Sequence, residues 1–374
     1  MNNLENTHFI NKAFREALQN QHSFALWKLP YTDEIHLILN ANKNIQQKPI
    51  FNEIKPGFVI SPFLNPQLKA TIFIPAEQMF SFPLLKSTED LFFESDKNNL
   101  NDMALFEADK NYFEKMVEEG ISLIKNNSLK KIVFARSKSV SYPEHYNPIN
   151  HFSRLCEAYK NTFVSLIFTP ETGAWMGATP EALLNLTATG LLKTVALAGT
   201  QVYEPSIDPK QAIWRQKEIE EQALVSRYII ECFKKVRVRE YEDIGPRTTV
   251  AGNLMHLKTD FTVDTIAIDY PHLGTSMLEL LHPTSAVCGM PKDVAIQNIL
   301  EKEQFDRSYF SGFIGPVNQQ NQCDLFVNIR CMQLTKNKAY LYAGAGITED
   351  SIPENEWCET EIKMKTILSD KFSA

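Results

Sequence analysis

The chain has 374 residues, of which 44% are hydrophobic, 11% aromatic and 22% charged, and its formal net charge is −7. These values are typical of a globular protein long enough for one to three domains, and the acidic balance argues against a nucleic-acid surface. Six cysteines without CxxC spacing indicate reduced core thiols. No segment is apolar enough to cross a bilayer or to form a signal region, so we expect a cytoplasmic protein without a membrane partner.

The first third of the sequence predicts one helix followed by short strands. Apolar residues at helical spacing predict an amphipathic helix over 4–19. From 22 to about 100, short β-rich pieces alternate with Pro and Asn turns and contain no recognisable catalytic motif. The polar stretch 96–104 suits a connector, and 106–127 predicts a helix.

The remaining sequence combines a long predicted helix over 209–236, whose lysine-rich end suits a C-terminus, with several strands. The strand-like segments are KIVFARSKSV, FVSLIF, LLKTVALAG, LFVNIRCMQL and AYLYAGAGI. Strands and helices do not alternate regularly, which disfavours a doubly wound parallel sheet. We therefore predict the α+β class with antiparallel sheets.

Two predicted helices carry pairs of glutamates three residues apart. Glu218 and Glu221 lie in KEIEEQ, and Glu356 and Glu359 lie in ENEWCETEIK, with Lys363 one turn further on. Residues at this spacing share a helix face, so two such helices could hold a hard divalent cation such as Mg²⁺ between them. Taken alone, either pair is more typical of a solvated helix surface.

Two further residues could transfer protons. Lys131 begins the apolar strand KIVFAR, where a lysine usually extends to water; a general base there must instead be buried and neutral. Glu181 lies in GATPEALLNL, where a glutamate commonly occupies the first turn of a helix. A partly desolvated carboxyl at the same place could act as a general acid.

Other motifs suit binding of an anion. The glycines of ALAGT (196–200) and YAGAGIT (342–348) are expected to end strands, where backbone N–H groups can approach an anion, although most such turns are ordinary. Arg330, in the apolar segment FVNIRC, needs a partner if it is buried, and a substrate carboxylate would serve. HPTSAVCGMPKD (282–293) is a loop bracketed by prolines. His256, in NLMHL, is more often a structural core histidine than a ligand.

The order of these motifs resembles the chorismate-utilising enzymes, a family that comprises isochorismate, salicylate, anthranilate and aminodeoxychorismate synthases. The matching motifs are KIVFAR, GATPEALL, ALAGT, KEIEEQ, NLMHL, HPTSAVCGMP, FDRSYFSGFIG, NIRC, AGAGI and EWCETEIK. The resemblance runs from about residue 108 to the C-terminus. It implies an anthranilate-synthase-like fold of two large, mainly antiparallel sheets packed together with helices outside. It also implies a single domain over 1–374, with a variable part over 1–105 and the motif-bearing core over 106–374.

The resemblance also implies roles for individual residues. Glu221 and Glu359 would bind Mg²⁺ directly, with Glu218 and Glu356 acting through water, and the ion would hold the ring carboxylate of chorismate. Arg330 and the backbone of Gly344 would hold the enolpyruvyl carboxylate. The residues implied to complete the pocket are Gly199, Thr200, His256 and Lys363. Glu354 and Glu361 would point away from the site and be solvated.

In the implied reaction, Lys131 takes a proton from the water that attacks C2 of the ring, and Glu181 protonates the departing C4 hydroxyl. Ammonia-adding members typically have glutamine in place of this lysine. Members that eliminate pyruvate have threonine and tyrosine in place of Ala286 and Phe310. Aminodeoxychorismate synthases often have lysine in place of Ala198.

These positions predict an isochorismate synthase that needs no glutaminase subunit. A salicylate synthase, an aminating enzyme and a non-catalytic chorismate-binding homologue remain alternatives. The enzyme step is shared, so menaquinone, a catechol siderophore and salicylate all remain possible destinations of the product. Two residues depart from the family pattern: Gln222 stands where histidine is usual, and Ser285 where proline is commoner. Because nearby glutamates keep a lysine protonated, we also expect Lys131 to be shielded from them by distance or by the metal.

Overall fold

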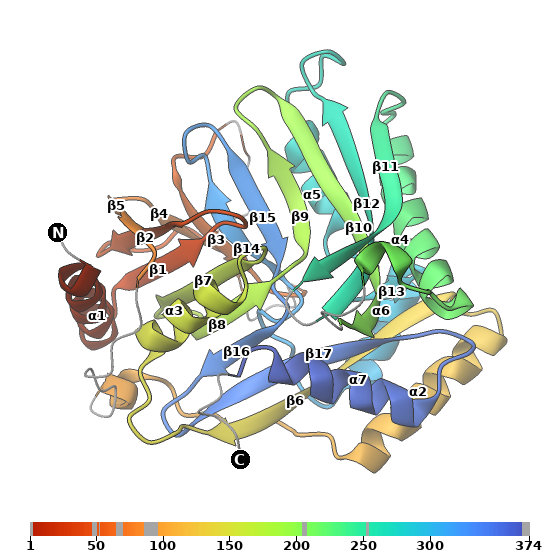
Figure 1. Cartoon of the computed structure of the whole chain (residues 1–374), viewed down its shortest axis with the longest axis horizontal. Helices are drawn as coiled ribbons and strands as arrows, with labels where there is room; N and C mark the ends of the chain where they lie inside the picture. The colour runs from red at the N-terminus through yellow and green to blue at the C-terminus, as the bar shows by residue number, and fades with distance from the viewer. Residues whose placement is uncertain are drawn as a thin grey trace.

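The computed structural model describes residues 3–46, 51, 53–64, 70–85, 96–203, 208–251 and 254–368. Two large sheets dominate this part of the chain, and all of their strand pairings are antiparallel. Side chains from both sheets meet in one apolar layer, and helices cover the outer faces (Figure 1). The predicted α+β class, with two packed antiparallel sheets and helices outside, is confirmed.

The first sheet has nine strands: β1 Ser23–Lys28, β2 Glu34–Asn40, β5 Gln78–Pro83, β6 Lys131–Ser141, β7 Phe163–Thr169, β8 Gly173–Thr179, β13 Gly289–Met290, β16 Cys331–Leu334 and β17 Lys338–Ile347. Their spatial order is β13-β6-β17-β16-β8-β7-β1-β2-β5.

The second sheet has eight strands: β3 Gly57–Ser61, β4 Ile72–Pro75, β9 Ala182–Leu186, β10 Leu191–Val202, β11 Glu242–Ala251, β12 Leu254–Asp264, β14 Phe313–Val317 and β15 Cys323–Val327. Their order is β11-β12-β10-β9-β15-β14-β3-β4. The five strands that precede residue 100 are therefore divided between the two sheets. The boundary between residues 105 and 106 stays a prediction.

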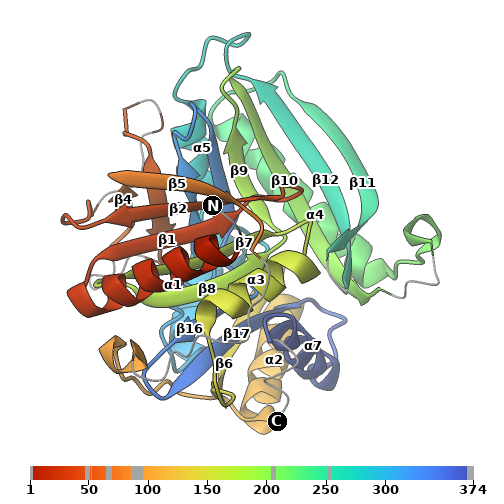
Figure 2. The same cartoon turned by 60° about the vertical axis from the view of Figure 1, so that its left-hand side comes forward.

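Seven α-helices lie in the described ranges: α1 Asn3–Asn20, α2 Lys110–Lys125, α3 Pro148–Ala158, α4 Gln216–Lys235, α5 Leu273–Leu281, α6 Lys292–Lys302 and α7 Pro353–Lys365. Two short 3₁₀ helices are η1 Asp96–Asn99 and η2 Pro209–Gln211. Helices α1 and α3 cover the first sheet over β1 and β7 (Figure 2), whereas α4 and α5 pack on β10 and β9 of the second sheet. None of the described helices is long and apolar enough to cross a membrane.

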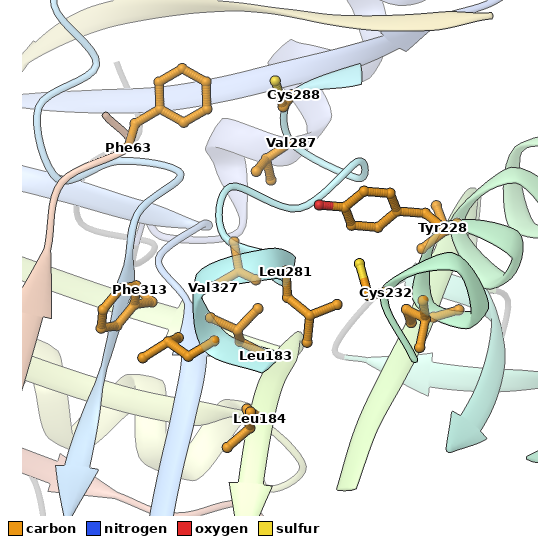
Figure 3. Close-up of a cluster of buried hydrophobic side chains, with 14 of the residues drawn as sticks. Phe63, Leu183, Leu184, Tyr228, Cys232, Leu281, Val287, Cys288, Phe313 and Val327 are labelled. Carbon is orange, nitrogen blue, oxygen red and sulfur yellow. The ribbon is translucent and has the colours of Figure 1, made fainter. Parts of the chain in front are cut away.

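Each sheet is covered on both faces, by the other sheet and by helices, and this explains the apolar pattern of the strands. Every residue of β1, β7 and β8 is buried, so a segment such as FVSLIF is continuously apolar rather than alternating. Figure 3 shows the outer layer of the second sheet, where side chains of β9, α5 and α4 gather in one apolar cluster. The Tyr228 hydroxyl in this cluster donates a hydrogen bond to Leu280 O at 2.6 Å, which joins α4 to α5.

The structure corrects the bounds of several predicted elements. The helix predicted over 106–127 begins at Lys110, because the Asp109 side chain accepts from Tyr112 N and caps it. The helix predicted over 209–236 begins only at Gln216, after the separate turn η2. The strand predicted from LFVNIRCMQL is divided, because the backbone turns between β15 and β16. The predicted strands KIVFARSKSV and FVSLIF are confirmed as β6 and β7, and the first predicted helix is confirmed as α1.

The cysteine prediction holds with one exception. All six thiols are free, and five of them are buried. Cys358 lies exposed on α7, so it is not a core thiol.

A buried ion pair links α6 to β6. Arg307 donates to both carboxylate oxygens of Glu303, at 2.7 and 2.5 Å, and to the carbonyls of Val287 and Val133, each at 2.7 Å. Glu303 in turn accepts from Ala135 N at 2.7 Å. Both charged side chains are almost completely buried. Such a pair is costly to break, because the remaining charge is left without compensation.

We expect Arg307→Met to lower the free energy of unfolding by about 3–5 kcal/mol, because it leaves the Glu303 carboxylate buried without its cation. Urea denaturation followed by far-UV circular dichroism measures the difference. The matched control is the double variant Arg307→Met, Glu303→Gln, which should recover part of the loss. A single-variant loss below about 1 kcal/mol, the size typical of an exposed pair, would contradict this role.

Candidate active site

One cavity, close to where the two sheets meet, collects most of the predicted site residues. The predicted residues that line it are Glu181, Gly199, Thr200, Glu221, His256, Ala286, Phe310, Arg330, Gly344 and Lys363. They come from β10, β12, β17, α4, α7 and the loops beside them, so segments far apart in the sequence meet here. Lys131, Glu218, Glu356 and Glu359 do not line the cavity.

Arg330 supplies a buried positive charge to this cavity. The sequence predicts that Arg330 lies inside a strand, but it lies between β15 and β16, and its backbone φ is 50°. Such a φ is uncommon outside glycine and often marks a functional position. Its Nη1 atom has no hydrogen-bond partner among the described residues. Burial lowers the pKa of Arg330 to about 10, so the guanidinium stays charged at neutral pH and suits an anionic ligand.

His256 presents a hydrogen-bond acceptor at the same cavity. Its Nδ1 lies 2.8 Å from Gly199 O, and because a carbonyl only accepts, Nδ1 carries the proton. Burial, followed by the charge of Arg330, lowers the pKa of His256 to about 3, so the ring is neutral. Nε2 is then an acceptor, and it has no partner in the described part of the chain. A hydroxyl group of a ligand would satisfy it.

Glu181 lies between β8 and β9 rather than in the first turn of a helix. Its backbone carbonyl accepts from Val327 N at 2.9 Å, which fixes the segment against β15. Burial raises the pKa of Glu181 to about 7, although Lys131, Lys363 and Arg330 act in the opposite direction. The protonated carboxyl is therefore well populated at neutral pH, and it is the form that acts as a general acid.

Lys131 is buried rather than extended to water, and it pairs with a predicted metal ligand. Its Nζ lies 2.6 Å from Glu221 Oε1, while only 1% of its side chain is exposed. Distance therefore does not shield Lys131 from the glutamates, and shielding by the metal stays a prediction. Although burial would raise the pKa of Glu221, the adjacent Lys131 ammonium holds it below its usual value.

The two predicted metal ligands on α7, Glu356 and Glu359, also pair with lysines. Lys363 Nζ lies 2.6 Å from Glu359 Oε1 and donates to Gly344 O at 2.8 Å. Glu356 is almost completely buried and pairs with Lys217 of α4. Burial, and then the charge of Glu359, raise the pKa of Glu356. Three lysines thus neutralise three of the four predicted metal-binding carboxylates.

The fourth carboxylate has a structural contact instead. Glu218 Oε2 accepts from Arg215 N at 3.0 Å and so caps the start of α4 from its third residue. The two remaining glutamates of the C-terminal segment differ from each other. Glu354 is exposed and pairs with Lys110. Glu361 pairs with Arg136 and Lys138, so the prediction that it is solvated is wrong.

Mg²⁺ fits the chemistry of these side chains. Carboxylate oxygens are the donors it prefers, and Glu356 Oε2 is buried with no hydrogen bond to the rest of the described chain. No three acidic, histidine or cysteine side chains in the described ranges converge on one point. The lysine pairs occupy the carboxylates in this arrangement, so an ion would have to replace some of these ammonium groups.

Two residues at the site were not predicted from the sequence. A Cβ on Gly346 would lie 2.6 Å from Glu221 Oε1 and 3.0 Å from Lys131 Cε, so only glycine leaves room for this ion pair. The motif AGAGI, whose second glycine is Gly346, could have indicated this position in the sequence. Lys217, the first residue of KEIEEQ, is the partner of Glu356. The glycines of AGAGI lie at the end of β17, as predicted, whereas ALAGT lies inside β10, which continues to Val202. Gly199 adopts a φ of 71° where the β10–β12 register shifts.

Neither of the two departures from the family pattern lines the cavity. Gln222 is buried, and its Nε2 donates to Thr259 Oγ1 at 2.9 Å and to Ala196 O at 3.3 Å. It therefore attaches α4 to the second sheet. Ser285 is also buried, next to the cavity residue Ala286.

The family profile described as "Chorismate binding enzyme" matches residues 77–370, so the chain belongs to the chorismate-binding enzymes. The isochorismate synthase EntC of Escherichia coli K12 is 27% identical over 326 residues, which cover 86% of this chain and 81% of EntC. The isochorismate synthase DhbC of Bacillus subtilis 168 is 30% identical over 267 residues, which cover 67% of this chain and 65% of DhbC.

Solved structures show the same fold. A putative 2,3-dihydroxybenzoate-specific isochorismate synthase, DhbC from Bacillus anthracis, aligns with a TM-score of 0.74 at 22% identity, covering 96% of this chain and 98% of that one. Anthranilate synthase component I from Streptococcus pneumoniae aligns with a TM-score of 0.68 at 19% identity, covering 92% and 89%. The predicted anthranilate-synthase-like fold and the predicted family are confirmed.

The raised pKa of Glu181 predicts a pH dependence of stability. The folded state keeps this proton up to a pH of about 7, whereas the unfolded state loses it near 4.5. The contribution of Glu181 to stability should therefore be fully present below pH 4.5 and fall as the pH rises through 7, by about 3 kcal/mol in total. Urea denaturation in EDTA at pH 5 and pH 8 measures it, with Glu181→Gln as the matched control. Equal pH dependence in the two proteins would show that the carboxyl is not desolvated.

Proposed function

We propose that this protein is a Mg²⁺-dependent isochorismate synthase, which converts chorismate reversibly to isochorismate. Water would add at C2 of the ring while the C4 hydroxyl is lost. The main support is the combination, around one cavity, of a buried lysine, a carboxyl with a raised pKa and a buried arginine whose Nη1 has no hydrogen-bond partner among the described residues. The names of the curated relatives favour the same reaction.

The spacing of the strands supports separate roles for Lys131 as the base and Glu181 as the acid. Lys131 begins β6, and Glu181 follows β8. Strands β17 and β16 lie between β6 and β8 in the sheet, which separates the two backbones by roughly 14 Å. That distance leaves room for a ring between a base on one side and an acid on the other.

Lys131 would take the proton from the attacking water, for which its ammonium group must first leave Glu221 and release its own proton to solvent. When bound, Mg²⁺ would neutralise the glutamates and hold the ring carboxylate of chorismate. Glu221 and Glu359 would contact the ion directly, and Glu218 and Glu356 would act through water. Glu218 would then have to leave its contact with Arg215 N or share it.

Glu181 would protonate the departing C4 hydroxyl, which leaves as water while the ring double bonds shift. Arg330 would hold the enolpyruvyl carboxylate together with the backbone of Gly344, and Nε2 of His256 would accept a hydrogen bond from the substrate. In the reverse reaction Lys131 and Glu181 would exchange their roles. Gly199, Thr200 and Lys363 would complete the pocket.

The residues beside the reacting ring favour a reaction that stops at isochorismate. Ala286 and Phe310 line the cavity and contain no side-chain hydroxyl. The ring of Phe310 stacks on Tyr342, with centroids 5.4 Å apart, which holds it in place. Independence from a glutaminase subunit and a cytoplasmic location stay predictions.

Lys131→Met should lower kcat for isochorismate formation by about 10²–10⁴-fold, because the base is lost while the apolar stem is kept. Separation of the products formed from chorismate and Mg²⁺ by liquid chromatography measures it. Glu181→Gln should cause a loss of similar size. Near-normal turnover of Lys131→Met with water as nucleophile would refute its role as the base.

The same assay distinguishes the related reactions. Coupling to lactate dehydrogenase should detect no pyruvate, and added ammonium should yield no anthranilate. Pyruvate in amounts equal to the substrate consumed would instead indicate a salicylate synthase. Binding of chorismate without any product would indicate a non-catalytic homologue.

Removal of the metal should weaken substrate binding, because the ring carboxylate of chorismate would lose the cation proposed to hold it. We expect isothermal titration calorimetry to show weak binding of Mg²⁺ to the free protein and of chorismate in EDTA. Mg²⁺ and chorismate together should each bind more tightly. Tight chorismate binding in EDTA would be incompatible with a metal-held carboxylate.

A further inference from the structure

The strand that carries Lys131 also carries a buried arginine on its other face. Side chains alternate along a strand, so Lys131 and Val133 belong to the face of β6 that meets the cavity. Ile132, Phe134 and Arg136 belong to the opposite face. Ile132 and Phe134 lie against α2, and Arg136 contacts α7. Figure 1 shows α2 and α7 side by side next to β6 and β17.

Arg136 contacts α7 in three ways. Its Nε donates to Thr360 Oγ1 at 2.8 Å, and its Nη2 donates to Glu361. The guanidinium carbon lies 3.7 Å from the centre of the Trp357 ring, which is a close cation–π contact. Thr360 Oγ1 donates in turn to Trp357 O at 2.7 Å. Only 2% of the Arg136 side chain is exposed, so these contacts replace water.

These contacts define how α7 is rotated about its axis. Successive residues of a helix are 100° apart, so Trp357, Thr360 and Glu361 share one side. Glu356 and Glu359 share the neighbouring side, about 120° away, where Glu356 pairs with Lys217 of α4 and Glu359 pairs with Lys363 of α7 itself. A helix held along the first side cannot turn without moving the glutamates on the second.

Two other contacts also hold α7, but they lie on the side of the helix that carries the proposed metal ligands: Lys217 pairs with Glu356, and Lys363 donates to Gly344 O at 2.8 Å. The remaining features of α7 fix its rotation less well than Arg136 does. The helix begins at Pro353 without a side-chain cap. Lys138 also pairs with Glu361, but it is 45% exposed, and an exposed lysine holds a carboxylate only weakly. The planar guanidinium of Arg136 is suited to hold two groups and an aromatic face together, which a lysine ammonium cannot do.

We propose that Arg136 is a positioning residue for the metal site: by holding Trp357, Thr360 and Glu361, it fixes α7 so that Glu356 and Glu359 face Glu221. This proposal rests on the proposed role of these glutamates in binding Mg²⁺. β6 would thus hold the base on one face and set the position of the metal ligands with the other. Arg136 itself touches neither the cavity nor the reacting atoms.

Two measurements test the proposal in the full-length protein. The first is amide hydrogen exchange by mass spectrometry in EDTA, which reports on α7 without any metal or turnover. The second is the Mg²⁺ concentration that gives half-maximal turnover. For Arg136→Met we expect exchange within 353–365 to become about tenfold faster while exchange within 216–235 stays unchanged. We also expect about a 10–100-fold higher Mg²⁺ requirement, the range seen when residues that support metal ligands are removed.

Matched variants separate positioning from general destabilisation. Lys138→Met removes the exposed partner of Glu361 and should stay within about twofold of wild type in both measurements, as expected for an exposed ion pair. Arg136→Lys keeps the charge but not the forked contact, and Trp357→Leu removes only the stacking ring. Both should show the Arg136→Met effects in weaker form, and they serve as the test if Arg136→Met does not fold.

The outcomes are distinct. Unchanged exchange in α7, or exchange that becomes equally faster in α4 and α7, would overturn the positioning role. Faster exchange in α7 with an unchanged Mg²⁺ requirement would overturn its link to the metal. If wild-type turnover does not depend on Mg²⁺ at all, the proposed metal site is wrong, and the exchange measurement alone then decides whether Arg136 positions α7.

Discussion

A buried carboxylate needs a compensating positive charge, and this requirement organises the cavity end of the molecule. Glu221, Glu356 and Glu359 are each paired with a lysine from another position in the sequence. The pairs join α4 to β6 and to α7, so the same charges that suit a metal ion also connect the elements around it. A divalent cation would offer these carboxylates a stronger partner, and Lys131 would then be free to act on water.

The two sheets make this arrangement possible because they are covered on both faces. Burial removes water from Arg330, His256 and Glu181. One nitrogen each of Arg330 and His256 is therefore left without a hydrogen-bond partner in the described ranges, and the pKa of Glu181 is raised to about 7. In water the charge of Arg330 would be screened, and the pKa values of His256 and Glu181 would return towards their usual values. The stability of the layers, including the buried pair of Arg307 and Glu303, is therefore a condition for the chemistry.

Much of the fold and of the site could be predicted from the sequence, because strand-length apolar segments and helix-period glutamates are local signals. The α+β class, α1, β6 and the gathering of Glu181, Arg330 and His256 followed from such patterns and from the family resemblance. What could not be predicted depends on neighbours distant in sequence. No local pattern shows that Lys131 meets Glu221, that Arg330 adopts a positive φ between two strands, or that Arg136 pairs with Glu361.

The origin of the hydroxyl oxygen at C2 tests the central claim most directly, that Lys131 and Glu181 handle two different water molecules. Unlabelled chorismate should be converted in water enriched in ¹⁸O, and the isochorismate formed should be analysed by mass spectrometry. If water attacks C2 while the C4 hydroxyl departs, the new C2 hydroxyl carries ¹⁸O. Isochorismate that retains the original oxygen would show that the hydroxyl group migrates within the substrate, and the roles given to both residues would be wrong.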